Sequence, residues 1–83
     1  MKYSVAWNPA AEAQLAEIWM AATDKQAVAD AANQIESLLR RAPLDVGESR
    51  TGNERILAVS PLCVRYDVWP DDLRVKVHSV WRF

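Results

Sequence analysis

The last 24 residues, SPLCVRYDVWPDDLRVKVHSVWRF (residues 60–83), decide the fold. They hold two runs rich in strand-forming side chains, residues 62–69 and 73–81, separated by the turn-forming triplet PDD. A connection this short favours an antiparallel pair. Because successive side chains of a strand point to opposite faces, counting along each run sorts the side chains of this pair into two sets.

One set is apolar and the other carries most of the charge. The apolar set comprises Val64, Tyr66, Val68, Val75, Val77 and Trp81. The charged set comprises Arg65, Asp67, Trp69, Arg74, Lys76, His78 and Arg82, with Val80 among them. Burial of unpaired cations costs far more than burial of valines, so we expect the apolar set to be covered and the charged set to face solvent.

The cover must come from the first half of the chain. Residues 3–7, YSVAW, predict a short strand, and Asn8 followed by Pro9 is a helix-start signal. The string TDKQ, residues 23–26, has the form of a capping box and predicts that a second helix begins there. Each helix presents an apolar stripe at helical spacing; the stripes comprise Ala11, Leu15, Ile18, Trp19 and Ala22 in the first, and Val28, Ala31, Ala32, Ile35, Leu38 and Leu39 in the second.

After Pro43 the chain is turn-rich through residue 53, and residues 54–60, ERILAVS, predict a further strand. The expected fold is therefore α+β: an N-terminal strand, an antiparallel helical hairpin and a three-stranded antiparallel meander. At 83 residues we expect one domain spanning residues 1–83.

Composition limits the classes of function. No apolar run approaches the roughly 18 residues of a membrane span, and we read no signal peptide, so we expect a cytoplasmic protein without a membrane partner. The single cysteine, Cys63, is expected to be a buried small hydrophobe. We see no metal-ligand cluster and expect no cofactor, and two glycines exclude a P-loop. The net charge of −1 divides into −3 over residues 1–49 and +2 over residues 50–83.

The charged set has two interpretations. An antiparallel sheet with one solvated face shows charge there in any case. Alternatively, the face acts on RNA, where cleavage by the 2′-hydroxyl needs a proton acceptor, cations for the phosphate charge and a donor to the leaving oxygen. His78 is the chain's only histidine and the natural acid or base. The phosphate-binding candidates are Arg65, Arg74, Lys76 and Arg82, and Trp69 offers a stacking surface.

Four strings in order resemble the RelE/ParE superfamily of type II toxin–antitoxin toxins: YSVAWNPAAEAQLAEIW (3–19), PLDVGESR (43–50), RILAVSPLCVRYDV (55–68) and VKVHSVWRF (75–83). The resemblance implies a helical hairpin on one face of a mainly antiparallel sheet and a toxin held inactive by a cognate antitoxin. RelE-like members cleave messenger RNA on the ribosome, whereas ParE-like members inhibit DNA gyrase.

The resemblance also assigns site residues. Arg55 falls where RelE-like toxins carry a basic residue on the second strand, and Arg82 falls near their last basic group. Their third-strand arginine corresponds most nearly to Cys63, with Arg65 as its neighbour. We therefore expect His78, Arg82 and Arg65 to be catalytic and Arg55, Arg74, Lys76 and Trp69 to bind RNA in a ribosome-dependent endoribonuclease. The alternatives are a gyrase inhibitor and a protein that only binds its antitoxin, on either the charged sheet face or the helical hairpin.

Overall fold

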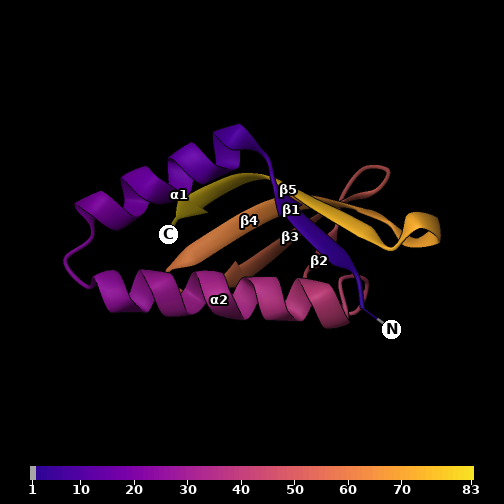
Figure 1. Cartoon of the computed structure of the whole chain (residues 1–83), viewed down its shortest axis with the longest axis horizontal. Helices are drawn as coiled ribbons and strands as arrows, with labels where there is room; N and C mark the ends of the chain where they lie inside the picture. Colours follow the sequence, from indigo (N-terminus) through magenta and orange to yellow (C-terminus); the bar gives the residue numbers. More distant parts are fainter. Residues whose placement is uncertain (1) are drawn as a thin grey trace.

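The structure, a computed structural model, describes residues 2–83, and its elements form one five-stranded sheet with two helices (Figure 1). The strand order is β1-β5-β4-β3-β2. Element bounds in chain order are β1 Ser4–Trp7, α1 Pro9–Ala21, α2 Lys25–Arg41, β2 Glu48–Ser49, β3 Glu54–Val59, β4 Leu62–Trp69, a 3₁₀ turn Pro70–Asp72, and β5 Arg74–Arg82. The α+β class and the antiparallel meander β3-β4-β5 confirm the sequence prediction.

Two strands complete the sheet at its edges. β1 pairs in parallel with β5, so that Val5 lies opposite Val75 and Trp7 opposite Val77. The helical hairpin and the meander form the long connection that a parallel pair requires. At the other edge, β2 lies inside the stretch that the sequence predicts as loop, and its two residues pair with Ile56 and Arg55.

The helices begin at side-chain caps. The Asn8 side chain accepts a hydrogen bond from the Ala11 amide (2.8 Å), and Pro9 follows as the first helical residue, as predicted. The predicted capping box at residues 23–26 is wrong by one residue: the cap of α2 is Asp24, whose carboxylate accepts from the Ala27 amide (3.0 Å). An aspartate caps as well as a threonine, so its position one residue closer to the helix decides the start.

Both helices cover the same face of the sheet and run antiparallel (Figure 1). α2 buries four of the six residues of the predicted stripe, Val28, Ala31, Ile35 and Leu39, against the inner side chains of the strands. The other two, Ala32 and Leu38, are partly buried. α1 packs mainly on β5. Beyond residue 77, β5 is no longer paired with β1, and there the Gln14 side chain accepts a hydrogen bond from the Val80 amide (2.9 Å). Gln14 lies outside the apolar stripe of α1, and this side chain ties the helix to the sheet.

The loop between α2 and β3 is held by the side chain of Tyr66. Its hydroxyl lies 3.0 Å from the carbonyl oxygens of both Pro43 and Val46, and the ring is fully buried. Gly47 follows at φ 72°, and a Cβ there would lie 2.5 Å from the Ile56 carbonyl oxygen and 2.9 Å from the Tyr66 hydroxyl. The loop therefore approaches the sheet more closely than any residue but glycine allows.

Candidate functional site

An extra residue in β5 divides this strand into two halves. Val77 pairs with Tyr66 and Ser79 pairs with Arg65, so His78 has no partner of its own in β4. Such a β-bulge shifts the alternation of side chains by one position. Up to His78 the faces are as predicted from the odd–even alternation of residue numbers (parity), and from Ser79 on they are exchanged.

The bulge corrects three of the predicted face assignments. Val80 is buried (3% exposed), although parity places it on the open face. Trp81 is 36% exposed and pairs with Cys63 on the open side, although parity places it in the core. Arg82 pairs with buried Leu62, so the alternation directs it to the helix side and away from His78.

The other predicted site residues divide between the two faces. Arg65, Arg74, Lys76, His78 and Trp69 lie on the face that carries no helix, as expected from parity. Arg55 does not, because it pairs with buried Tyr66 and so lies on the helix side of β3. Its guanidinium donates to the carbonyl oxygens of Val46 (3.1 Å) and Gly47 (3.3 Å). Arg55 therefore stabilises the loop in this structure.

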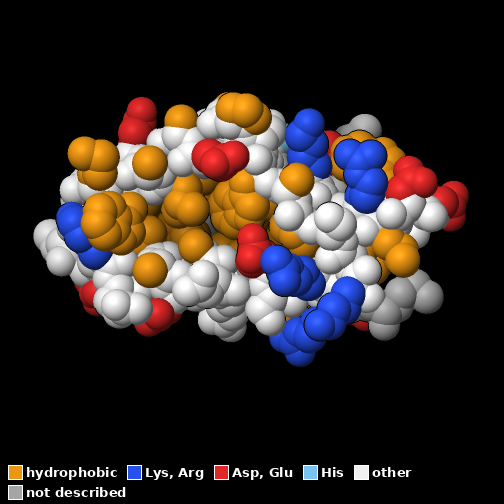
Figure 2. All heavy atoms as spheres, viewed as in Figure 1, with side chains coloured by type: hydrophobic (Ala, Val, Ile, Leu, Met, Phe, Trp, Pro, Cys, Tyr) orange, Lys and Arg blue, Asp and Glu red, His pale blue; other side chains and the backbone are white. Residues whose placement is uncertain are grey.

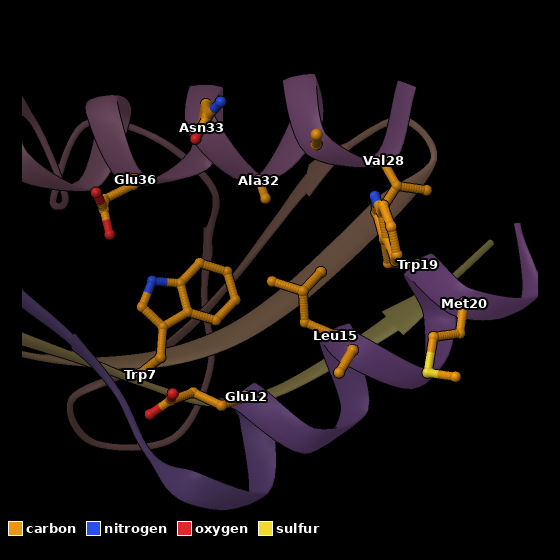
Figure 3. A pocket seen from close by; sticks show the side chains of 11 residues that line it. Trp7, Glu12, Leu15, Trp19, Met20, Val28, Ala32, Asn33 and Glu36 are labelled. Atoms are coloured by element: carbon orange, nitrogen blue, oxygen red, sulfur yellow. The ribbon is translucent and has the colours of Figure 1, made fainter. Parts of the chain in front are cut away.

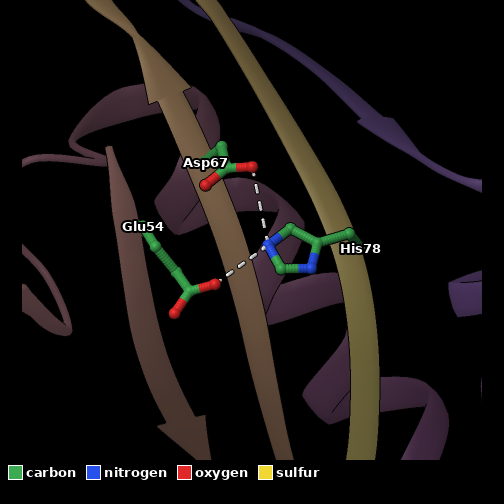
Figure 4. A group of neighbouring side chains, drawn as sticks. All are labelled: Glu54, Asp67 and His78. Atoms are coloured by element: carbon green, nitrogen blue, oxygen red, sulfur yellow. Dashed lines mark ion pairs between the residues drawn. The ribbon is translucent and has the colours of Figure 1, made fainter. Parts of the chain in front are cut away.

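Three side chains from adjacent strands converge at the centre of the open face (Figure 4). His78 Nε2 lies 3.6 Å from a carboxylate oxygen of Glu54 on β3 and 3.6 Å from one of Asp67 on β4. These distances are longer than a hydrogen bond. His78 Nε2 has no contact with solvent and no hydrogen-bond partner among residues 2–83. We call this group the β3-β4-β5 cluster; parity alone could not reveal it, because Glu54 joins through the register of β3.

Two arginine–tryptophan pairs lie on the same face. The Arg74 guanidinium is 6.0 Å from the centre of the Trp69 ring, and the Arg65 guanidinium is 5.6 Å from that of Trp81. Distances of this size allow an attraction between cation and ring. Arg65 Nε also lies 3.7 Å from Glu54 Oε1. The face thus combines cations with one exposed and one partly buried tryptophan ring, but Glu54 and Asp67 reduce its positive charge.

Cys63 lies beside this surface but is poorly suited to react. It is free and buried, and burial raises the pKa of its thiol. Since the thiolate is the nucleophile, a raised pKa lowers reactivity. Its expected role as a small buried side chain agrees with its position.

A second surface feature is an apolar groove between α1 and α2, with a volume of about 870 Å³ (Figures 2 and 3). Figure 3 shows Trp7 and Leu15 directed into it, with Trp19 at one end and Glu12 and Glu36 at its borders. Met20 at the rim is 72% exposed. The helices of the hairpin diverge, so their apolar stripes leave hydrophobic surface uncovered.

Together, a helical hairpin over one face of a meander and an open face with cations define a fold class that solved structures share. The toxin–antitoxin complex RelBE2 from Mycobacterium tuberculosis matches with a TM-score of 0.81 and 17% identity, over 100% of this chain and 93% of that one. The chromosomal ParDE TA system from P. aeruginosa matches with a TM-score of 0.75 and 21% identity, over 98% of this chain and 96% of that one. The isolated E. coli RelE toxin matches with a TM-score of 0.64 and 17% identity, over 96% of this chain and 83% of that one.

The fold is that of the RelE/ParE toxins, as the sequence resemblance predicts. No family model and no curated protein matches the sequence. Within residues 2–83, neither helix has the length and apolar character needed to cross a membrane.

Proposed function

We propose that this chain is the toxin of a type II toxin–antitoxin system and that an antitoxin holds it inactive. The proposal is supported by the likeness in fold, over 96–100% of the chain, to structures described as RelE, RelBE2 and ParDE proteins. The four resembling strings of sequence support it independently. A toxin of this kind acts in the cytoplasm, where we expect the protein.

For its activity we favour ribosome-dependent cleavage of messenger RNA. The observation that carries this choice is the open face, where Arg65, Arg74, Lys76 and His78 lie with the exposed ring of Trp81 and the partly buried ring of Trp69. In this mechanism His78 exchanges the proton of the attacking 2′-hydroxyl or of the leaving oxygen, and Arg65 stabilises the phosphate charge. Arg74 and Lys76 hold neighbouring phosphates, and a tryptophan ring stacks on a base.

The two arginines on opposite sides of the sheet provide a charge-matched test. Arg65→Ala and His78→Ala should relieve growth arrest and abolish mRNA cleavage on purified ribosomes, measured by primer extension. Arg82→Ala removes the same charge from the helix side and should keep both activities. Full activity in the first two variants, or loss in Arg82→Ala alone, would contradict the proposed RNA site.

One observation favours a second candidate, inhibition of DNA gyrase without nuclease activity. Glu54 and Asp67 lie beside His78 and would repel RNA phosphate, which weakens the case for cleavage. The purified chain should then block DNA supercoiling by gyrase while leaving translation in a cell-free extract unchanged. A chain that is harmless when expressed without its partner would contradict both toxin activities and leave antitoxin binding alone.

We further propose that the antitoxin places an apolar segment flanked by basic residues in the groove between α1 and α2. The groove exposes apolar side chains, and its acidic borders, Glu12 and Glu36, complement basic flanks. Two alanines of α1 give a matched test, since Ala16 lines the groove and Ala13 does not. Ala16→Glu should weaken antitoxin binding more than about tenfold in calorimetry, whereas Ala13→Glu should not. Equal affinities would place the antitoxin elsewhere.

A further inference from the structure

We propose that the β3-β4-β5 cluster, Glu54, Asp67 and His78, is a binding site for a divalent transition metal, with Zn²⁺ as the preferred ion. The site shares His78 with the proposed nuclease site, and the test below measures metal binding without any toxin activity. It consists of one imidazole and two carboxylates, a set of ligands that suits Zn²⁺ and its neighbours in the first transition row. Within residues 2–83 these are the three metal-ligating side chains that lie close enough to share one ion.

The distances fit a shared ion better than they fit hydrogen bonds. Ligand atoms about 2.0–2.1 Å from a tetrahedral Zn²⁺ lie roughly 3.3–3.4 Å from one another. His78 Nε2 lies 3.6 Å from each carboxylate oxygen, and all three ligand atoms lie within 4.8 Å of one another. Movements of a few tenths of an ångström bring the imidazole into range of both carboxylates, and a small rotation of either carboxylate closes the third edge.

The imidazole nitrogen supplies a second observation. His78 Nε2 points between the two carboxylates, is shielded from solvent and has no hydrogen-bond partner among the described residues (Figure 4). A buried polar atom without a partner is unfavourable, and an ion coordinated by this nitrogen would satisfy it. The three side chains are each only 27–31% exposed, and each stands on a strand of the sheet.

Two cations limit the affinity. Arg65 Nε lies 3.7 Å from Glu54 Oε1, the oxygen that does not face His78, and Lys76 is paired with Asp67 across the strands. Both repel a bound dication. Removal of the Arg65 charge should therefore strengthen metal binding, by roughly threefold or more at low salt. Adventitious binding to exposed carboxylates would not respond in this way.

The test is calorimetric titration of the full chain, without any histidine tag, with ZnCl₂, MnCl₂ and MgCl₂. We expect one Zn²⁺ per chain, weaker Mn²⁺ and the weakest Mg²⁺ binding. His78→Ala, Glu54→Gln and Asp67→Asn should each reduce the Zn²⁺ affinity more than about tenfold. Arg65→Gln should raise it, and Asp71→Asn, an acidic control on the 3₁₀ turn, should leave it unchanged.

Cys63→Ser separates this site from a thiol site, because cysteine is the other strong zinc ligand on this side of the sheet. The variant should bind Zn²⁺ as the parent chain does. Circular dichroism of each variant checks that it is folded. Absence of Zn²⁺ binding by the folded parent chain would overturn the proposal and leave the cluster as an ion-pair network. Binding that is lost in Cys63→Ser but kept in His78→Ala would overturn it as well.

Discussion

Substitution of two glycines by alanine separates the cost of a close contact from the cost of a backbone angle. Gly47 and Gly52 both have positive φ, 72° and 63°, so alanine at either position meets the left-handed penalty of roughly 1 kcal/mol. At Gly52 the added Cβ meets nothing within 4 Å. At Gly47 it lies 2.5 Å from the Ile56 carbonyl oxygen, about 1 Å inside normal contact.

The clash at Gly47 can be relieved only by moving the loop. That movement disturbs the hydrogen bond that the single Tyr66 hydroxyl proton shares between the carbonyl oxygens of Pro43 and Val46, worth about 1 kcal/mol. We therefore expect Gly47→Ala to lower the free energy of unfolding by about 2 kcal/mol and Gly52→Ala by about 1 kcal/mol. In a chain of this size these values correspond to drops in Tm of roughly 8–16 °C and 4–8 °C.

Thermal unfolding followed by circular dichroism measures both values, with urea unfolding as a second measure. Gly47→Ala combined with Tyr66→Phe should remain as unstable as Gly47→Ala alone, because the backbone carbonyl of Ile56 stays in place. Equal drops in Tm for the two glycine variants would refute the reasoning, since the shared φ penalty would then account for both.

Three further outcomes follow from the same structure. Burial raises the pKa of the Tyr66 hydroxyl, so the contribution of this group to the free energy of unfolding is complete below about pH 10 and is lost as the pH rises through the folded-state pKa. In urea unfolding, the stability of the parent chain should therefore fall more steeply above pH 10 than that of Tyr66→Phe. Gln14→Leu removes the acceptor of the Val80 amide and should lower Tm by about 4–8 °C, whereas Gln26→Leu, on the exposed side of α2, should change it little. Deletion of Ser79 should close the bulge and place His78 opposite Arg65, while Val80 keeps its partner Val64 and its place in the core; Tm should therefore fall by no more than roughly 4–8 °C, and a much larger drop would contradict the register.

Local signals explain what the sequence predicts well. Asn8 caps the helix and Pro9 suits its first position, so these two residues alone predict the start of α1. The apolar stripe of α2 is predicted from helical periodicity alone. The first halves of β4 and β5 alternate strictly, so parity gives their faces correctly up to His78. Each of these inferences depends on residues within a few positions of one another.

The remaining features depend on how strands pair, which no short stretch of sequence states. The bulge is the clearest case: the adjacent apolar residues Val80 and Trp81 show that the alternation must break, but not where. Glu54, Asp67 and His78 come from three strands and meet only through the combined register of β3, β4 and β5. Arg55 lies on the helix side because it pairs with Tyr66, a contact that is likewise set by register.

The unpaired residue in β5 also affects how this surface can evolve. In a relative with the same number of residues but a regular strand at that point, the last residues of the strand would take the opposite sides, while β1, β3 and the first half of β5 keep their neighbours. Relatives that share the same core can thus present different chemical groups at the end of the strand. Residue-by-residue transfer of roles from one relative to another is dependable only for the part of β5 that precedes the unpaired residue.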